Sequence, residues 1–248
     1  MMPSDEKKIL LGKVALVTGG SRGIGRAIAE AYALAGAKVF ICGRDENKLT
    51  EAVDAIGHAG GDIDGTFGDI GNLEDVQRIA SNALRRFGTV HVLVNNASIL
   101  GPRETIANYP VDAWDEVLRI NLSSVFLMTR AVLPTMLRQR SGSIINVTSG
   151  VGRRGRARWG AYAISKAGLE SFTQVLANEV TQAGIRVNSV NPAATRTRMR
   201  AQAYPAEDSL TLPTPKEIVP VFLYLASDAS AGVSGQALDA RDWRQKTD

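Results

Sequence analysis

The chain has 248 residues, 44% hydrophobic and 22% charged, with a formal net charge of +4, which suits a soluble protein with a sizeable core. The small charge gives no indication of nucleic-acid binding, and no apolar run is expected to span a membrane. A single cysteine excludes an internal disulfide framework, and the first ten residues lack the apolar region of a secretory signal, so a cytoplasmic location is expected.

Short apolar segments alternate with longer segments of helical periodicity along the whole chain. Asp45 is expected to cap the second helix, and Pro134 to kink the longest one. The expected strands are 13–19, 37–42, 63–70 (weak), 90–98, 142–149, 184–192 and 235–240. The expected helices are 27–36, 45–57, 72–88, 111–140, 159–180 and 215–227.

This alternation predicts an α/β fold, with a parallel sheet of six or seven strands covered by helices on both faces. No linker or low-complexity segment divides the chain, so residues 1–248 are interpreted as one doubly wound Rossmann-like domain. A cofactor half is placed at about 10–100, and a catalytic and substrate half at about 101–240. Residues 191–214 are too long for an ordinary connection, and 199–212 are predicted to form a mobile lid.

A glycine-rich turn, "TGGSRGIG" at 18–25, follows the first strand and opens the first helix. Backbone N–H groups at such a junction can approach a pyrophosphate at the positive end of the helix. The glycine spacing is not the usual G-x-G-x-x-G, so the prediction of a cofactor site relies on the position of the turn between a strand and a helix. The residues predicted to contact a cofactor here are Gly19, Ser21, Arg22, Gly23, Ile24 and Gly25.

The residues at the end of the second strand indicate which dinucleotide is preferred. An adenosine ribose with a free 2′-hydroxyl is usually met by a carboxylate there, but this chain has Gly43 followed by Arg44. A guanidinium suits a 2′-phosphate, and Arg22 can add a second positive charge. Asp45 is the competing acid, better placed as a helix cap. NADP(H) is therefore favoured over NAD(H).

Tyr162 and Lys166 are four positions apart in "GAYAISKAG", so they share one face of a helix. The pair has two readings. It is either a core aromatic residue beside a surface lysine, or a tyrosine whose proton moves while the lysine lowers its pKa.

Over nearly its whole length the chain resembles the classical short-chain dehydrogenase/reductase family. The matching segments, in family order, are "TGGSRGIG", "GDI" at 68–70, "NNAS" at 95–98, "RINLSS" at 119–124, "INVTS" at 145–149, "YAISK" at 162–166 and "NPAATRT" at 191–197. The resemblance implies a catalytic tetrad of Asn121, Ser149, Tyr162 and Lys166. Tyr162 then supplies a proton to a carbonyl oxygen, and Ser149 hydrogen-bonds that oxygen. Asn121 continues a proton relay from Lys166 through water, and either a local helix distortion or a water contact is expected at this poor helix-interior residue.

The resemblance also implies further cofactor contacts. Asp69 contacts the adenine, although it also suits a turn, and Asn95 lies beside the adenosine ribose. Lys166 additionally holds the nicotinamide ribose. Thr197 and the backbone near Thr195 contact the nicotinamide amide. No metal is expected.

The chain departs from the family pattern at three places. Ala193 replaces the glycine that usually follows "NP", Ser98 replaces the glycine of "NNAG", and "DARDW" at 239–243 replaces a "DGG" pattern. These changes concern the substrate pocket and the C-terminal tetramer contact. The segment from Thr195 to Asp208 resembles a bacterial branch of reductases without an assigned substrate.

The expected activity is NADP(H)-dependent reduction of a ketone, or the reverse alcohol oxidation. A 3-oxoacyl group on acyl carrier protein is one candidate, with Arg140 and the Arg153–Arg158 run facing the carrier, although that run also suits a solvated loop. Against a carrier, Ala183 stands where carrier-using enzymes tend to be basic. A free ketone, sugar or steroid is an equally open candidate for the substrate.

The alternative function is an NADP-binding sensor or scaffold without turnover. A homodimer or homotetramer is expected, with no nucleic-acid or membrane partner.

Overall fold

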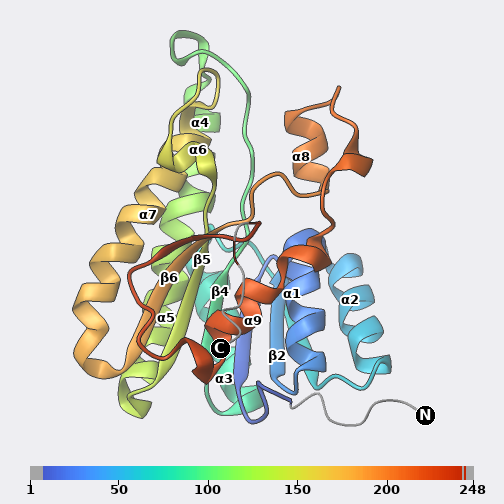
Figure 1. Ribbon diagram of the computed structural model, residues 1–248, viewed down its shortest axis with the longest axis vertical. Helices are drawn as coiled ribbons and strands as arrows, with labels where there is room; N and C mark the ends of the chain where they lie inside the picture. Colours follow the sequence, from blue (N-terminus) through green and yellow to red (C-terminus); the bar gives the residue numbers. More distant parts are fainter. Residues whose placement is uncertain (1–7, 242, 244–248) are drawn as a thin grey trace.

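The computed structural model describes residues 8–241 and 243. The expectations for the first residues and for the ends of the domain therefore lie partly outside the described residues, which leave out 1–7, 242 and 244–248. The described chain forms one sheet with helices on both faces, as the alternation predicts (Figure 1).

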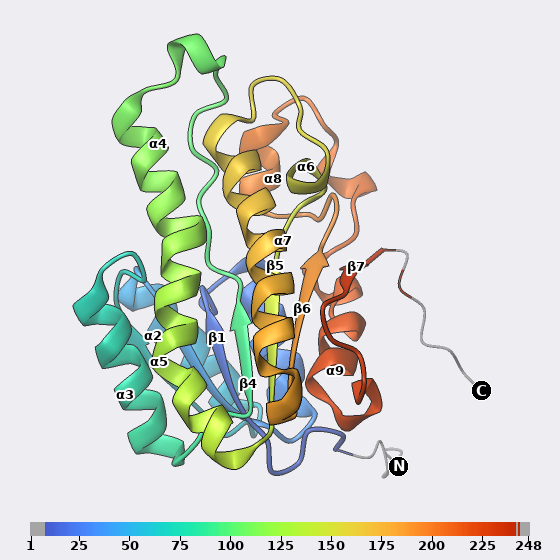
Figure 2. The ribbon, with the colours of Figure 1, turned by 90° about the vertical axis from the view of Figure 1, so that its left-hand side faces the viewer.

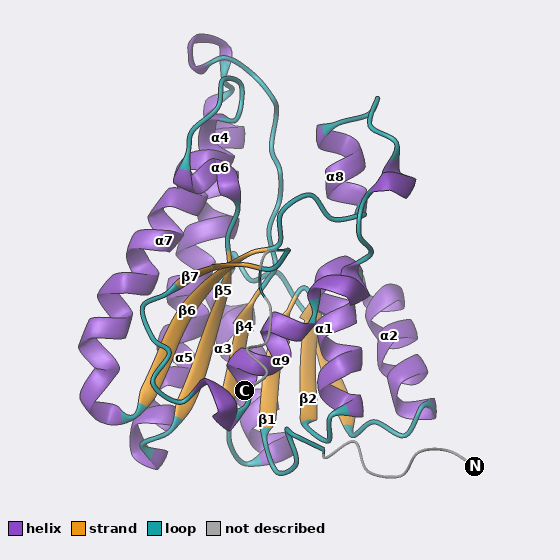
Figure 3. Ribbon diagram, viewed as in Figure 1, coloured by secondary structure: helices purple, strands orange, loops and turns teal. Residues whose placement is uncertain are grey.

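All seven strands run parallel, in the order β3-β2-β1-β4-β5-β6-β7 (Figure 3). The connections reverse direction between β1 and β4, and such a switch point is where open α/β sheets bind ligands, at the carboxyl ends of the strands. The strands are β1 (Val14–Thr18), β2 (Lys38–Gly43), β3 (Ile63–Phe67), β4 (Val92–Asn95), β5 (Gly142–Val147), β6 (Ile185–Asn191) and β7 (Ala237–Asp239).

Alternate residues of the strands fill two cores. In β1, Ala15 and Val17 face the core under α1, α2 and α9, whereas Leu16 faces the core under α3, α5 and α7. Both sets are fully buried, as period-2 alternation in a doubly covered sheet requires. Figures 1 and 2 show the two helical layers. The main helices are α1 (Gly23–Leu34), α2 (Glu46–His58), α3 (Leu73–Phe87), α4 (Val111–Leu118), α5 (Ser124–Gln139), α7 (Gly160–Val180) and α9 (Pro220–Ala226).

The stretch from Val111 to Gln139 is helical throughout, but a π-helical turn, η2 (Arg119–Ser123), interrupts it. Asn121 lies within this turn, so the expected local distortion is confirmed. Pro134 lies inside α5, which continues to Gln139.

By length and composition, this helical stretch could also cross a membrane, which the sequence reading did not expect. The burial of its side chains explains why the stretch is apolar. Met128, Val132 and Met136 are at most 1% exposed and pack with strand residues in one core. The core helix of a globular protein has the same composition, and we interpret the stretch in that way.

The segment 191–214 is more regular than expected. It contains a short helix, α8 (Arg198–Ala203), and a 3-10 turn, η4 (Ser209–Thr211). A six-residue helix is too short to produce a recognisable hydrophobic period, so the sequence pattern gave no sign of it. The other short helices are α6 (Gly150–Arg153) and the 3-10 turns η1 (Ile106–Asn108), η3 (Thr181–Ala183), η5 (Pro215–Ile218) and η6 (Asp228–Ser230).

Candidate active site

The glycine-rich turn connects β1 to α1 at the switch point of the sheet. Gly19 and Gly23 have φ angles of 66° and 57°, which side chains rarely tolerate. A Cβ atom at Gly25 would lie 2.3 Å from the carbonyl oxygen of Gly19, so the turn packs too closely for any side chain there. The three glycines are therefore required by the turn itself.

Asn96 fixes the turn from the neighbouring strand end. Its Nδ2 atom donates to the carbonyl oxygens of Thr18 (2.8 Å) and Gly19 (3.2 Å). Asn95 was expected at this site from the sequence, whereas Asn96 was not. Two consecutive asparagines at the end of an apolar strand could have indicated Asn96 as well. Successive side chains there point in opposite directions, so one can contact the sheet and the other the turn.

The start of α1 fits an anionic group. No side chain caps the helix at Arg22, and no acidic residue lies in the first turn. An uncapped helix start presents backbone N–H groups and the positive end of the dipole to whatever lies before it. The side chain of Arg22 is exposed at the same place. The turn therefore fits the pyrophosphate of a dinucleotide.

The end of β2 lies against the turn. A Cβ atom at Gly43 would lie 2.9 Å from Oγ of Ser21, so an acidic side chain at residue 43 would press on the turn. Arg44 follows and is exposed. Asp45 accepts a hydrogen bond of 3.1 Å from the backbone N–H of Lys48, which confirms it as the cap of α2. The competing acid is therefore occupied by the helix.

Asp69 and Asn95, the two residues placed by resemblance near the adenosine, differ in exposure. Asp69 is partly exposed; its Oδ1 accepts from the backbone N–H of Gly71 (2.9 Å) and its Oδ2 pairs with Arg119 (3.3 Å). Its turn role is thus confirmed. Asn95 is 3% exposed and donates to Oδ1 of Asn146 (2.9 Å), while its own Oδ1 has no partner among the described residues.

Three tetrad residues meet beyond the carboxyl end of β5. Ser149 follows the strand and precedes α6, while Tyr162 and Lys166 lie one turn apart on α7. The Nζ atom of Lys166 donates to the carbonyl oxygen of Val147 (2.8 Å) and lies 5.7 Å from the centre of the Tyr162 ring. Both side chains are buried, so the core-aromatic reading is right about the tyrosine, but the lysine is 2% exposed and is not a surface residue.

Burial perturbs both groups. It raises the pKa of Tyr162 to about 12, while a hydrogen bond with the side chain of Ser149 acts in the opposite direction. Burial lowers the pKa of Lys166 to about 8, and the carboxylate of Glu170 counteracts that shift. Two titratable groups with strongly shifted pKa values, one helical turn apart beyond the carboxyl end of β5, mark a candidate catalytic site.

Asn121, the fourth tetrad residue, is fully buried in the π-helical turn. Its amide exchanges hydrogen bonds with the backbone of Ile99, accepting from N–H (2.8 Å) and donating to the carbonyl oxygen (2.9 Å). It also donates to Oγ of Ser165 (3.2 Å), and Ser165 immediately precedes Lys166. Asn121 thus connects the segment after β4 to α7, the helix that carries Tyr162 and Lys166.

The basic run Arg153–Arg158 is not simply a solvated loop, as the sequence also allowed. Arg153 ends α6 and pairs through Nε with Oε1 of Glu170 (2.8 Å) and through Nη1 with Oδ2 of Asp239 (2.8 Å). Arg158 pairs with Glu104 (3.2 Å). Arg140 lies before β5 and the run lies after it, at opposite ends of the strand, so they do not form one basic surface.

The segment after β6 approaches the glycine-rich turn. Thr197 caps α8, and its Cγ2 atom lies 3.9 Å from where a Cβ atom of Gly23 would stand. Thr195 is buried and donates to the carbonyl oxygen of Pro192 (2.8 Å). Ala193 has a φ angle of 56°, in the left-handed region that favours glycine.

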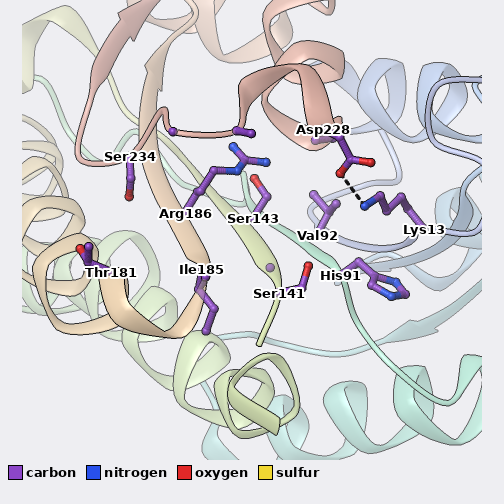
Figure 4. Close-up of a pocket in the computed structure, with 15 residues that line it drawn as sticks. Lys13, His91, Val92, Ser141, Ser143, Thr181, Ile185, Arg186, Asp228 and Ser234 are labelled. Atoms are coloured by element: carbon purple, nitrogen blue, oxygen red, sulfur yellow. Dashed lines mark hydrogen bonds and ion pairs between the residues drawn. The ribbon is translucent and has the colours of Figure 1, made fainter. Parts of the chain in front are cut away.

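A cavity of about 390 Å³ lies at the other end of the sheet and contains no tetrad residue (Figure 4). Its lining includes Lys13, His91 and Arg186, together with Asp228, whose carboxylate pairs with Lys13 (2.8 Å). Among residues 8–241 and 243, no group of three His, Cys, Asp or Glu side chains is placed to hold a metal ion.

Comparison with known proteins agrees with this geometry. The family model of the short chain dehydrogenases matches residues 13–208. The uncharacterized oxidoreductase YciK of Escherichia coli K12 is 39% identical over 247 residues, covering 97% of this chain and 96% of its own. The 3-oxoacyl-acyl-carrier-protein reductase FabG of Vibrio cholerae serotype O1 is 37% identical over 237 residues, covering 92% and 96%. A short chain dehydrogenase of E. coli CFT073, crystallised with NADPH, superposes with a TM-score of 0.91 at 38% identity, covering 96% of this chain and 100% of that one.

Proposed function

The chain belongs to the short-chain dehydrogenase family, and from that premise we propose that it is an NADP(H)-dependent oxidoreductase acting on a carbonyl group. It reduces a ketone to an alcohol, or catalyses the reverse oxidation. The NADPH complex of the E. coli CFT073 relative supports the cofactor, and the printed activity of FabG supports carbonyl reduction.

The cofactor lies across the switch point of the sheet in this proposal. The turn from Gly19 to Gly25 holds the pyrophosphate, and Arg44 with Arg22 holds the 2′-phosphate. When bound, NADPH supplies the hydride for the carbonyl carbon. Asp69 and Asn95 lie towards the adenosine, and Thr195, Thr197 and Lys166 lie towards the nicotinamide.

The residues of the chain manage the proton. The Tyr162 phenol donates it to the carbonyl oxygen, so that an alcohol forms and a phenolate remains. The ammonium group of Lys166 stabilises that phenolate, since an opposite charge at close range favours the ionised form. Ser149 donates a hydrogen bond to the same oxygen as charge develops on it. Asn121 positions the helix that carries both Tyr162 and Lys166 through its contact with Ser165.

One observation carries the proposal above all. A phenol, a hydroxyl and an ammonium group converge in a largely buried site, next to a helix start that is open to an anion. A sensor or scaffold that only binds the nucleotide has no need for such a proton-transfer group. The intact tetrad therefore favours turnover over that alternative.

The substrate class within this proposal includes a 3-oxoacyl group. Arg140 lies apart from the Arg153–Arg158 run, so any acidic carrier would meet the run alone. The homodimer or homotetramer expected from the sequence stays a prediction, which light scattering of the purified protein tests.

The decisive experiment is a panel of carbonyl compounds mixed with the purified protein and NADPH, followed by the loss of NADPH absorbance. We expect oxidation of NADPH with at least one ketone, and a slower rate with NADH. NADPH that binds but is not consumed with any ketone or with the corresponding alcohols and NADP+ would favour the sensor reading.

A further inference from the structure

A cavity of about 670 Å³ opens between the segment that follows β4 and the end of α8. Leu100 and Gly101 line one side, and Ala203 and Pro205 line the other. Its two charged lining residues are both arginines, Arg103 and Arg158. The cavity therefore joins an apolar wall to a positively charged one.

Trp159 contacts both Arg103 of the cavity and the proposed catalytic tyrosine, Tyr162. The rings of Trp159 and Tyr162 have their centres 5.5 Å apart, and Cζ of Arg103 lies 4.6 Å from the centre of a Trp159 ring. Trp159 is only 7% exposed, and its indole packs between the Tyr162 ring and the Arg103 guanidinium. A substrate whose carbonyl lies at Tyr162 therefore has Arg103 one side chain away.

Arg103 differs from the arginines near it. Arg158 pairs with Glu104 (3.2 Å), and Arg200 pairs with both carboxylate oxygens of Glu207 (2.6 Å each). Arg103 forms no ion pair with any carboxylate of the described residues, and its positive charge is not compensated locally.

The guanidinium of Arg103 is held in place without a counter-charge. It lies over the ring of Trp159 and over that of Tyr204, the latter at 5.0 Å, and Nη1 donates to the carbonyl oxygen of Ala203. Its Nε atom is buried, with no acceptor among the described residues. A partly desolvated guanidinium on a cavity wall is suited to bind an anion, because its N–H groups can donate charge-assisted hydrogen bonds to carboxylate or phosphate oxygens.

We propose that this cavity binds an anionic group of the substrate, a carboxylate or a phosphate, and that Arg103 selects for it. This inference rests on the proposed function and names its substrate class: a ketone whose negative charge lies several bonds from the carbonyl. Arg103 is a specificity-determining residue. It anchors the charged end while Tyr162 and Ser149 act on the carbonyl oxygen.

The test compares charged and neutral forms of the same ketone. The carboxylate arm uses 5-oxohexanoate and its methyl ester; the phosphate arm uses acetoacetyl-coenzyme A and its neutral N-acetylcysteamine thioester. We expect the wild-type protein to have a roughly tenfold lower KM for at least one charged form than for its neutral counterpart. The arm that shows the preference identifies the anion.

Arg103→Gln is expected to abolish that preference by raising the KM of the charged form to that of its neutral counterpart. Arg103→Lys is expected to restore part of it. Arg156→Gln is the matched control, because Arg156 is an exposed member of the same basic run but does not line the cavity. Should Arg103→Gln unfold, Arg158→Gln is expected to weaken the same preference in a folded protein.

Equal KM values for charged and neutral forms in the wild type would overturn the proposal. An Arg103→Gln variant in which the KM values of the charged and neutral forms rise equally would also overturn it, since Arg103 would then only hold α8 in place. If the protein reduces only the neutral ketones, the proposed function is retained and the anion site is rejected. If none of the four compounds is reduced, calorimetric titration of 5-oxohexanoate and acetoacetyl-coenzyme A still tests the site: weaker binding to Arg103→Gln supports it, and equal or absent binding rejects it.

Discussion

Glu170 binds Arg153 through an ion pair of 2.8 Å between Oε1 and Nε, one helical turn beyond Lys166. Its other carboxylate oxygen accepts from the Ser189 hydroxyl. The carboxylate is thereby fixed near an ammonium group whose pKa burial has lowered to about 8, and its charge acts to raise that pKa. The carboxylate of Glu170 therefore favours the protonated form of Lys166.

Replacing Glu170 by Gln is expected to shift the alkaline limb of activity to lower pH. Without the carboxylate, the pKa of Lys166 falls further, and the lysine loses its charge earlier as the pH rises. The phenolate of Tyr162 then loses its stabilising charge at a lower pH than in the wild type. The measurement is kcat/KM for ketone reduction against pH, which reports the ionisation of the enzyme before it binds the ketone.

Glu179→Gln is the control for this experiment, because Glu179 is exposed on the same helix. It is expected to leave the profile where it was. An alkaline limb that coincides in Glu170→Gln and wild type would show that Glu170 has no electrostatic influence on Lys166.

Tyr162→Phe is expected to retain NADPH binding and to lose turnover by about 10²- to 10⁴-fold, because only the transferable proton is removed. Phenylalanine conserves the ring that packs against Trp159 at 5.5 Å, so the fold should be unaffected. Fluorescence titration of NADPH and steady-state rates on an accepted ketone test the two halves of the prediction. Wild-type rates in the variant would mean that another group donates the proton.

Arg44→Asp is expected to weaken NADPH binding by roughly 10- to 100-fold and to improve NADH binding, since a phosphate partner becomes a hydroxyl partner. Titrations of both cofactors on both proteins measure this. Arg138→Asp, at an exposed position of α5, controls for the change in net charge. A wild-type protein that binds NADH as tightly as NADPH would contradict the role of Arg44.

Ala193→Gly is expected to raise the free energy of unfolding by about 1 kcal/mol, because alanine is strained at a φ angle of 56°. For a chain of this size the melting temperature should rise by roughly 2–4 °C. Ala194→Gly is the matched control: its φ angle is not positive, so glycine there should only lower stability. A variant at 193 that melts at or below the wild-type temperature would show that the backbone strain is compensated.

The segment 199–212 is expected to exchange its amide hydrogens fastest among the internal segments of the free protein, and to become protected with NADPH and an inhibitor. Side chains hold it to the rest of the molecule: Arg103 contacts Tyr204 and Ala203, and Arg196 donates to the carbonyl oxygens of Leu210 and Leu212. Such contacts break and re-form more readily than a continuous backbone ladder. Hydrogen exchange followed by mass spectrometry measures this. High protection without ligands that does not change on binding would make the segment a fixed wall of the pocket.

The sequence determined the secondary structure, the sheet and part of the site because these depend on local spacing. The alternation of apolar strands and amphipathic helices predicted a parallel sheet covered on both faces, and seven parallel strands are present. Asp45 was identifiable as a cap, and Asn121 as a site of distortion, because each property follows from one side chain in its helix. The shared face of Tyr162 and Lys166 follows from their four-residue separation alone.

Only the tertiary structure decided what lies between elements distant in the chain. Lys166 bonds the backbone of Val147, and the Asn96 amide closes on the turn after β1. The contact of Arg103 with Tyr204 joins residues about a hundred positions apart. No local pattern encodes such contacts, since they follow from which strand ends meet and how the segments above them pack. The shared helix face of Tyr162 and Lys166 was therefore predictable from the sequence, whereas the position of the Arg103 guanidinium against Trp159 and Tyr204 became visible only in the folded chain.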